Sequence, residues 1–378
     1  MGHVYITRTA SFLPHDPIDN DHMEEYLGFI DDKPSKSRRL VLRNNGIKTR
    51  YYAMTKDGRP THNNAQIAAE SIRRLTGDGL ELTDIDFMGT GTTSPDQVVP
   101  SHASMIHGEL GHATMEIAGF QGSCCSSMNA MRMAYLGIRA GAMKTAAAVG
   151  SEMMSSWMRA ENFQEEIRSA KEIEENPILA FEKDFLRWML SDGSGAALLQ
   201  DKPNDQGISL RIDWMELKSF ANQLDTCMYA GGDKESDGRL TGWRQMSPEE
   251  GMHKSVFSLK QDVRLLGDNI VERGNDFLKE LAVKYQMDFD KIDYFLPHLS
   301  SNFFRQKIMD SLDSTGMSIP AEKWFTNLSK VGNVGAASPF LMLDELFHSG
   351  RLKSGDIIFM MIPESARFTY AYVYLTVC

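Results

Sequence analysis

Three residues that could act together in acyl chemistry lie at junctions between strand-like and helix-like segments. Cys124 follows a small-residue turn, His298 follows an apolar run and a proline, and Asn333 lies in a glycine-rich turn. A cysteine can accept an acyl group as a thioester. Histidine and asparagine can donate hydrogen bonds that stabilise an enolate or an oxyanion. The set therefore predicts acyl transfer followed by carbon–carbon bond formation.

Each of these residues also has a plainer interpretation when it is taken alone. A cysteine in an apolar segment is more often an inert core residue, and His298 would be a structural loop histidine. Asn333 would be a turn residue that tolerates left-handed geometry. The position of Cys124 before a helix predicts a lowered thiol pKa, because unpaired helix N–H groups favour the thiolate. The sequence assigns no role to the adjacent Cys125.

An internal repeat connects the three junctions. The segment DIDFMGTGTTSP resembles the later segment KIDYFLPHLSSN. Cys124 precedes Gly141 by 17 residues, and Asn333 precedes Gly350 by the same 17. Such self-similarity predicts two related halves. Cys124 and Asn333 occupy equivalent positions in this alignment, and a pseudo-twofold axis would bring the junctions to one central site.

Alternating strands and helices are expected to position these residues. Apolar runs predict strands at 84–88, 146–149, 196–199, 294–296, 357–362 and 370–377. Amphipathic stretches predict helices at 64–75, 126–140, 259–285, 301–312 and 338–348. This alternation favours an α/β fold with a substantially buried sheet.

The repeat divides the chain into two predicted halves, residues 1–205 and 206–378. The first half carries the cysteine, and the second carries the histidine and the asparagine. Each half also contains a segment that breaks the repeat, at about 153–190 and about 214–253. We interpret both insertions as segments that cover a site, because long non-repeating segments often form binding walls.

Composition excludes several other classes of protein. The 378 residues carry a formal net charge of −11, which disfavours attachment to nucleic acid or to anionic lipid. No apolar run reaches the roughly 18 residues of a membrane span, and the N-terminus lacks a secretory pattern. Four cysteines favour a reduced, cytoplasmic chain over a disulfide scaffold. No metal site is predicted, since the histidines at 102, 107 and 112 drift around a helix.

Ordered motifs over nearly the whole chain resemble those of the β-ketoacyl-acyl-carrier-protein synthase III type of condensing enzyme, in the thiolase superfamily. The motifs read RTASFLPHDPIDN, NNGIKTRYYA, GTTSPDQVVPSHA, LSDGSGAALL, PHLSSN, GNVGAAS and RFTYAYVYL. The resemblance implies a thiolase fold, in which two similar α/β halves form five αβαβα layers with inserted cap segments. It also implies a homodimer that uses acyl carrier protein or acyl-CoA. It implies no cofactor beyond the phosphopantetheine that carries the substrates.

The resemblance assigns roles to individual residues. Cys124 aligns with the acylated nucleophile, and His298 and Asn333 align with the condensing pair. The backbone N–H groups of Cys124 and Ala366 would form the oxyanion hole, although the turn around Ala366 lacks the family's glycines. Val99 aligns with a bulky aromatic gate, and its smaller side chain would widen the acyl tunnel.

The departures from the family concern the substrate. The CoA-clamping tryptophan and arginine align near Leu40 and Asn44, so CoA stacking is not expected. Segment 33–50 holds seven basic residues and no acid, and it predicts a docking surface for an acidic carrier protein. A solvated helix face is the alternative. The residues predicted to bind the carrier are Lys36, Arg38, Arg39, Arg43 and Arg50.

Glu152 stands where the family usually has an aspartate. One interpretation is a structural partner for backbone N–H groups. The other is an additional acid or base near the thioester. The sequence leaves both interpretations open.

The predicted function is a ketosynthase that condenses an acyl group on Cys124 with a malonyl or β-ketoacyl thioester. The departures resemble the subset that makes secondary lipids, including dialkylresorcinol- and stilbene-forming ketosynthase–cyclases, which join two acyl chains and close a cyclohexanedione ring. Glu152 would then assist the cyclisation. One alternative is aldol condensation of the hydroxymethylglutaryl-CoA synthase type. The other is a non-catalytic partner of an active ketosynthase, which the presence of all three residues disfavours.

Overall fold

A computed structural model describes residues 2–29, 34–35, 38–111, 114–162 and 186–378 of the chain. Nine strands form its main sheet, in the order β13-β14-β15-β8-β1-β7-β6-β4-β5. The strands from the first half are β1 (Tyr5–Phe12), β4 (Phe87–Thr92), β5 (Glu116–Gln121), β6 (Thr145–Glu152) and β7 (Gly193–Gln200). Those from the second half are β8 (Leu210–Ser219), β13 (Tyr294–Pro297), β14 (Ile357–Glu364) and β15 (Thr369–Val377). The two sets meet at a short β1–β8 contact, where Tyr5 pairs with Arg211 and Ile6 with Leu210.

The strand order repeats between the two parts of the sheet. Along β4-β6-β7-β1, one parallel pair is followed by two antiparallel pairs. The series β13-β14-β15-β8 has the same pairings. Strand β5 pairs in parallel with β4, and the second half has a single parallel bridge there, between Phe295 and Trp324. The self-similarity of the sequence is therefore also a repeat of topology.

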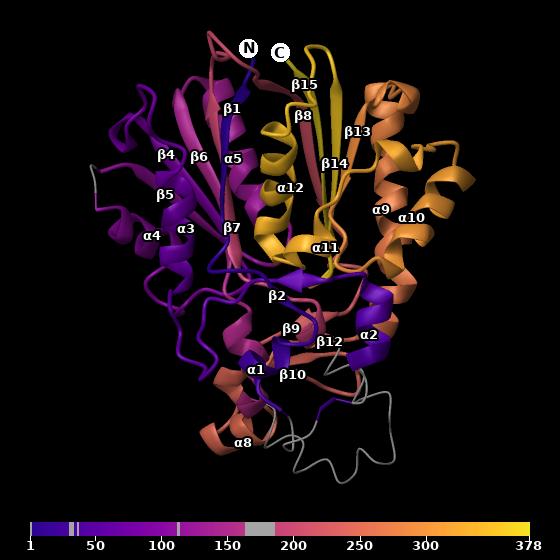
Figure 1. Ribbon diagram of the computed structural model, residues 1–378. Helices are drawn as coiled ribbons and strands as arrows, with labels where there is room; N and C mark the ends of the chain where they lie inside the picture. Colours follow the sequence, from indigo (N-terminus) through magenta and orange to yellow (C-terminus); the bar gives the residue numbers. More distant parts are fainter. Residues whose placement is uncertain (1, 30–33, 36–37, 112–113, 163–185) are drawn as a thin grey trace.

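Helices cover both parts of the sheet and also fill the space between them (Figure 1). In the first half, α3 (Asn64–Arg73) and α4 (His102–Leu110) lie on the outer face. In the second half, α9 (Val263–Tyr285) and α10 (Phe303–Ser314) take the equivalent outer position. The middle layer holds α5 (Ser126–Ala140) and α12 (Ser338–Phe347). The molecule is thus the five-layer αβαβα thiolase fold.

Period-2 alternation along the strands explains the layers. In β14, Ile358 and Met360 face the middle core, whereas Phe359 and Met361 face the α9 side. In β15, Ala371 faces the middle core, and its two tyrosine neighbours face outward. Successive strand residues point to opposite faces of a sheet, so both faces must be apolar when helices cover both. The continuous apolar runs of β6, β14 and β15 follow from that double burial.

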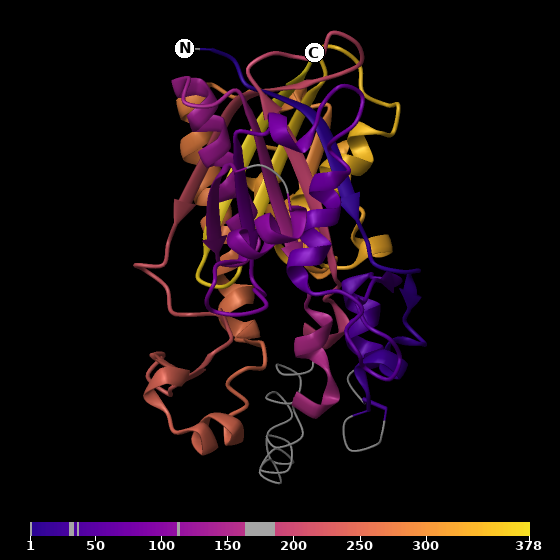
Figure 2. The ribbon, with the colours of Figure 1, turned by 90° about the vertical axis from the view of Figure 1, so that its left-hand side faces the viewer.

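Smaller elements gather at the end of the molecule opposite the two termini (Figure 2). The N-terminal segment contributes β2 (Ile18–Asp19), α1 (Met23–Leu27), α2 (Arg38–Asn45) and β3 (Thr49–Arg50). The second-half insertion contributes β9 (Met228–Tyr229), β10 (Gly232–Lys234), β11 (Leu240–Gly242), α8 (Pro248–His253) and β12 (Lys260–Gln261). This insertion begins later than residue 214, because β8 continues to Ser219. Much of the first-half insertion, 163–185, lies outside the described residues.

The predicted helices and strands are present, with changes at their ends. Helix α9 begins at Val263 and not at 259, because the side chain of Asp262 caps it and Lys260–Gln261 pairs with β9 instead. Strand β4 begins at Phe87, since Leu82–Asp84 forms a 3₁₀ turn. The sequence patterns did not indicate β1, β5 and β8, whose polar residues interrupt the apolar runs. Among the described helices, none combines the length and the apolar character needed to cross a membrane.

Candidate active site

The loop from β5 to α5 carries the two adjacent cysteines. Helix α5, which follows this loop, packs closely against β4. A Cβ atom on Gly91 of β4 would lie only 2.2 Å from the backbone N of Ser127. Cys124 lines a pocket and is only 7% exposed. The thiol of Cys125 instead donates to the carbonyl oxygen of Ile362 at 3.1 Å, inside the middle core. The structure therefore places Cys124, and not Cys125, where a substrate can reach it.

Burial dominates the acidity of the Cys124 thiol. It raises the pKa of Cys124 to about 12, and the negative charges of Glu364 and Glu152 act in the same direction. The Ser123 hydroxyl, 3.5 Å from the Cys124 sulphur, lowers the pKa but does not outweigh burial. The predicted lowering of this pKa is thus wrong. Helix α5 begins only at Ser126, so Cys124 precedes its first turn.

His298 follows β13 at the carboxyl end of the parallel pair β13–β14. Its backbone N–H donates to the carbonyl oxygen of Met361 at 2.8 Å, which holds the residue beside β14. The side chain is 3% exposed, and Nε2 has no hydrogen-bond partner within the described ranges. Burial lowers the pKa of His298 to about 4. The imidazole is therefore neutral at physiological pH, with one ring nitrogen free to meet a substrate.

Asn333 is held by backbone and side-chain contacts in a turn before α12. Its backbone N–H donates to Met189 at 2.9 Å, and its carbonyl oxygen accepts from Ser191 at 3.0 Å. Its side-chain Oδ1 accepts from the backbone N–H of Gly335 at 3.0 Å. Because an N–H donor occupies the amide oxygen, the amide NH₂ group is the part left to act on a ligand.

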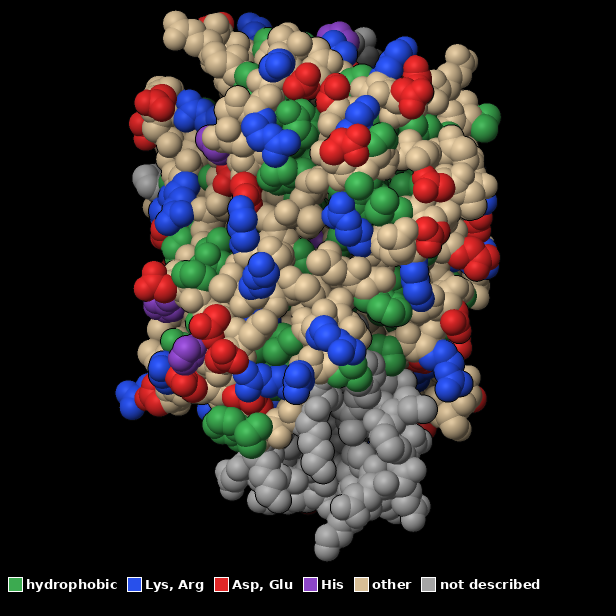
Figure 3. All heavy atoms as spheres, turned by 45° about the vertical axis from the view of Figure 1, so that its right-hand side comes forward, with side chains coloured by type: hydrophobic (Ala, Val, Ile, Leu, Met, Phe, Trp, Pro, Cys, Tyr) green, Lys and Arg blue, Asp and Glu red, His purple; other side chains and the backbone are tan. Residues whose placement is uncertain are grey.

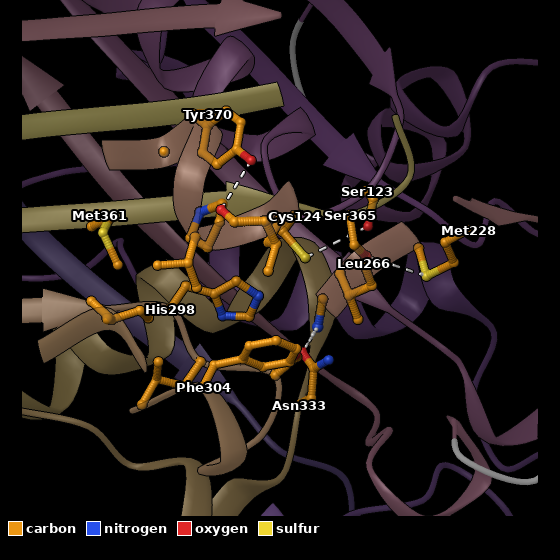
Figure 4. Close-up of a pocket in the computed structure, with 18 of the residues that line it drawn as sticks. Ser123, Cys124, Met228, Leu266, His298, Phe304, Asn333, Met361, Ser365 and Tyr370 are labelled. Atoms are coloured by element: carbon orange, nitrogen blue, oxygen red, sulfur yellow. Dashed lines mark hydrogen bonds between the residues drawn. The ribbon is translucent and has the colours of Figure 1, made fainter. Parts of the chain in front are cut away.

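Cys124, His298 and Asn333 line one pocket, in which Figure 4 shows their side chains. The predicted convergence of the three residues is therefore observed. From these residues the pocket extends along α9, α10 and the outer face of β14 and β15. Most of its wall is apolar, and Leu266, Ile270, Phe304 and Ile308 are examples. A buried thiol that shares a largely apolar pocket with a histidine and an asparagine suits a thioester whose tail is hydrocarbon.

The Glu152 carboxylate joins the loop after β4 to the turn that follows Asn333. Its carboxylate accepts hydrogen bonds from the backbone N–H and the hydroxyl of both Thr93 and Ser94, and from the backbone N–H of Ala336 at 3.0 Å. A Cβ on Gly335 would lie 2.7 Å from Oε1, so only glycine fits there. Burial raises the pKa of Glu152. Glu152 is not among the pocket-lining residues, and the structure supports its structural interpretation.

The turn between β14 and β15 differs from the predicted oxyanion hole. The backbone N–H of Ala366 donates to Oε1 of Glu364 at 3.1 Å, so this donor is already occupied. This bond does not favour the predicted role of the Ala366 N–H in the oxyanion hole. The second-half insertion also binds this turn, because Cys227 N–H donates to the carbonyl oxygen of Ala366 at 2.9 Å. The turn differs from the family's glycine-rich turn because it begins with Glu364, whose carboxylate accepts the Ala366 N–H.

The predicted carrier-binding residues separate into two groups. Arg50 is fully buried and donates to Asn20 Oδ1 at 2.7 Å, so its assignment is wrong. Arg38 is neutralised by Glu24, with a 2.8 Å ion pair. Lys36 lies outside the described residues. Two members of the set are exposed on α2, namely Arg39 and Arg43.

The residues aligned with the family's clamp and gate also lie at the surface. Leu40 is 46% exposed on α2, where a CoA-clamping tryptophan was expected from the family. Val99 is 81% exposed and does not line the pocket of its own chain. A gating role for Val99 therefore requires a second copy of the chain.

Several pocket residues were missed by the sequence analysis. Ser123 contacts the Cys124 sulphur, and its adjacency to Cys124 was the available signal. Ser365 lines the pocket beside Met228, which comes from the insertion. The pocket-lining residues of α9 and α10 could not be recognised from the sequence, because their apolar spacing is that of any amphipathic helix. Within the described ranges, no group of three or more His, Cys, Asp or Glu is arranged to hold a metal ion.

Two family models match the chain. The model described as 3-oxoacyl-[acyl-carrier-protein] synthase III C terminal matches residues 283–363. The model described as beta-ketoacyl synthase, N-terminal domain, matches residues 76–204. These ranges contain Cys124, His298 and Asn333.

Relatives and solved structures match along nearly the full length. A beta-ketoacyl-[acyl-carrier-protein] synthase III of Clostridium perfringens is 24% identical over 354 residues, which cover 93% of this chain and 92% of the relative. The enzyme of the same name from Rickettsia rickettsii is 24% identical and covers 92% of each chain. Among solved structures, the tetronic acid condensing enzyme AbyA1 superposes with a TM-score of 0.75 at 18% identity, over 99% of both chains. Xanthomonas campestris OleA, with bound lauric acid and lauroyl-CoA, has the same TM-score, identity and coverage.

Proposed function

Because this chain belongs to the β-ketoacyl-acyl-carrier-protein synthase III type of condensing enzyme, in the thiolase superfamily, we propose that it forms a carbon–carbon bond by Claisen condensation on Cys124. The observation that carries the proposal is that Cys124, His298 and Asn333 line one largely apolar pocket. The nucleophile comes from the first half of the chain and the two donors from the second. Such an arrangement suits an enzyme that handles two thioesters in turn.

The first step loads an acyl group. The Cys124 sulphur attacks the carbonyl carbon of an acyl thioester, the bond to the carrier sulphur breaks, and acyl-Cys124 forms. The thiol proton leaves with the carrier, which departs as a free thiol. Because burial raises the pKa of the Cys124 thiol, the sulphur gives up its proton as it attacks the thioester carbonyl. The loaded acyl chain then occupies the apolar tunnel.

The second step makes the carbon–carbon bond. A malonyl or β-ketoacyl thioester enters, and its enolate forms by loss of carbon dioxide or of a proton. A neutral His298 nitrogen and the Asn333 amide donate hydrogen bonds to the enolate oxygen. The enolate carbon attacks the acyl-Cys124 carbonyl, the carbon–sulphur bond breaks, and the Cys124 thiolate leaves. The thiolate then takes up one proton from solvent, which balances the α-proton that a β-ketoacyl thioester releases. The product is a longer β-ketoacyl thioester.

We also propose that the acyl groups arrive on a carrier protein. Arg39 and Arg43 project from α2, and the backbone N–H of Asn302 joins the start of α10 to Asn45 at the end of α2. Lys307 of α10 adds a third exposed cation. Figure 3 shows this side of the molecule, with Lys and Arg in the middle of its lower half and acidic side chains toward its margins. A basic surface near the pocket suits an acidic carrier.

A ring-forming second reaction is the finer form of the proposal. AbyA1 is a tetronic acid condensing enzyme, and a tetronic acid contains a ring. A dialkylresorcinol-type cyclisation would need the extended β-keto product to fold back within the same pocket. Glu152 would not take part, because its carboxylate is bound by the 92–94 loop and the Asn333 turn. Product structure distinguishes a cyclohexanedione from a linear β-ketoacyl thioester.

A homodimer is the oligomeric state that we propose. Val98 and Val99 are 80% and 81% exposed, and they lie in the loop after β4. Strand β5 is the edge of the sheet in the same half. Exposed valines and a sheet edge are both liabilities in an isolated chain, and a second copy that covered them would remove both.

Intact-mass measurement with an acyl thioester tests the first step. The wild-type protein is expected to gain one acyl group, and Cys124→Ala is expected to gain none. Cys125→Ala is the matched control and is expected to load normally, because its thiol points into the core. An adduct on Cys124→Ala would contradict the assignment. Adding a malonyl- or β-ketoacyl-carrier then tests the condensation through the mass of the released product.

Charge reversal on α2 tests the carrier surface. Arg39→Glu/Arg43→Glu is expected to raise KM for an acyl carrier protein by about 10-fold, with little effect on an acyl-N-acetylcysteamine substrate. Lys202→Glu/Lys353→Glu is the control, since these exposed lysines lie at the end of the molecule that holds the termini. Equal effects on the carrier and the small thioester would rule out α2 as the docking surface.

A further inference from the structure

The turn between β14 and β15 lies beside the loop that carries Cys124. The thiol of Cys125 donates to the carbonyl oxygen of Ile362 in β14 at 3.1 Å. It also lies 3.5 Å from the carbonyl oxygen of Thr369, the first residue of β15. Because Cys124 directly precedes Cys125, the turn that joins these two strand ends lies next to Cys124.

Ser365 is the residue of this turn that lines the pocket together with Cys124. Figure 4 shows the two side chains next to each other. The Ser365 hydroxyl donates to the thioether sulphur of Met228, with 3.8 Å between oxygen and sulphur. A thioether is a weak acceptor, so a carbonyl oxygen that entered the pocket would be a better partner for this hydroxyl.

The backbone that carries Ser365 is held by the second-half insertion. The backbone N–H groups of Cys227 and Met228 both donate to the carbonyl oxygen of Ala366, at 2.9 and 3.2 Å. The N–H of Ala366 itself donates to Oε1 of Glu364 at 3.1 Å. Ser365 is therefore placed before any substrate binds, and a donor placed in advance needs little reorganisation during the reaction.

Acyl transfer at Cys124 creates a negative charge that this site does not favour. When the sulphur attacks a thioester, an electron pair moves from the carbonyl double bond to its oxygen, and burial makes such a charge costly. The negative charges of Glu364 and Glu152 also disfavour an anion here, since both raise the pKa of Cys124. The oxyanion therefore needs a hydrogen-bond donor, and the Ala366 N–H is already bonded to Glu364.

We propose that Ser365 is a further catalytic residue, whose hydroxyl donates a hydrogen bond to the thioester carbonyl oxygen as Cys124 attacks. The hydroxyl turns from the Met228 sulphur to this oxygen as the oxyanion forms. When the carbonyl double bond forms again, the bond to the carrier sulphur breaks and the carrier leaves. Ser365 keeps its proton throughout. This inference rests on the proposed function, because it concerns the acyl transfer that Cys124 carries out.

Two reactions of Cys124 in Ser365→Ala test the proposal. Acylation by an acyl-N-acetylcysteamine thioester passes through an oxyanion, whereas alkylation by iodoacetamide displaces iodide from a saturated carbon and forms none. Ser365→Ala is expected to acylate about 10²-fold more slowly than wild type and to be alkylated at the wild-type rate. Both rates are measured by intact mass, with Cys124→Ala as the blank. Acylation at the wild-type rate would overturn the proposal, and so would an equal loss of both reactions.

Two further variants assign the effect to the hydroxyl. Ser365→Thr retains a hydroxyl and is expected to recover most of the acylation rate, and a rate as low as that of Ser365→Ala would overturn the role of the hydroxyl. Arg367→Ala, at an exposed position of the same turn, is the matched control and is expected to acylate normally. An equal loss in this control would assign the effect to the turn as a whole and overturn the proposal. A wild-type protein that is alkylated but never acylated would instead contradict the proposed function, and this inference with it.

Discussion

The two halves share a topology, and the pocket that holds Cys124, His298 and Asn333 lies between the sheet and the outer helices of the second half. In the first half, α3 buries Ala65, Ala68 and Ala69 in a cluster with small residues of β6 and β7. In the second half, the 23-residue α9 faces Tyr370 and Tyr372 of β15.

Side-chain size accounts for the difference between the halves. Alanines let a helix lie close to a sheet, whereas tyrosines and long aliphatic side chains hold it away and leave gaps between them. Both tyrosine hydroxyls donate to α9 carbonyl oxygens, at Ile270 and Gly274, which fixes the spacing on that side. The same strand order therefore accompanies close helix–sheet packing at α3 and a pocket beside α9.

The largest expected effect is a loss of condensation without a loss of acylation, which tests whether the two halves carry out different steps. His298→Ala and Asn333→Ala are each expected to lower the rate of condensation by about 10²–10³-fold, because each removes a donor to the enolate oxygen. Both variants are expected to keep acylation of Cys124, since the nucleophile belongs to the other half. Single-turnover loading and product formation are measured separately by mass. Equal loss of both steps would show that the halves do not divide the reaction.

A second prediction concerns the contrast between the closed and the open outer layer. Ala68→Leu in α3 is expected to lower the free energy of unfolding by about 1–3 kcal/mol, because no space is available there. Ile270→Phe on the tunnel wall is expected to cost less stability and to shift acylation toward shorter chains. Denaturant unfolding and loading rates over a chain-length series measure the two effects. A chain-length shift in Ala68→Leu would show that the tunnel is not confined to the second half.

A third prediction is a pH dependence of stability that the two halves share. His102 in the first half and His298 in the second are both buried, and burial lowers the pKa of each to about 4. Unfolding restores the ordinary value near 6.5, so the unfolded chain binds more protons between these values. Stability is therefore expected to fall as the pH decreases from about 6.5 to about 4.

Substitution separates the two histidines. His102→Gln removes the contribution of the first half, in which His102 Nε2 lies 2.9 Å from the Ser151 Oγ. His298→Gln removes the contribution of the second half. Each variant is expected to show a shallower loss of stability with acid, and the double variant the shallowest, in denaturant unfolding at a series of pH values. An unchanged slope in both single variants would assign the acid sensitivity to other groups.

Much of the fold and the identity of the three site residues were predictable from the sequence. The 3.6- and 2-residue periods that mark helices and strands are local, so α5 was predicted with both ends correct. The internal repeat placed Cys124, His298 and Asn333 at comparable junctions, and the structure brings them to one pocket. A repeat has consequences for the arrangement in space, because two copies of one topology pack about a pseudo-twofold axis.

Properties that depend on neighbours distant in the chain were decided only by the tertiary structure. Burial overturned the predicted acidity of Cys124, and Glu364 occupied the Ala366 N–H. Arg50 belongs to a basic segment but is fully buried. The partners of Glu152, the thiol contact of Cys125 and the location of the tunnel likewise come from elements far apart in sequence. Residue types and spacing determine which chemistry is available, whereas desolvation and hydrogen-bond partners exist only once the layers have packed.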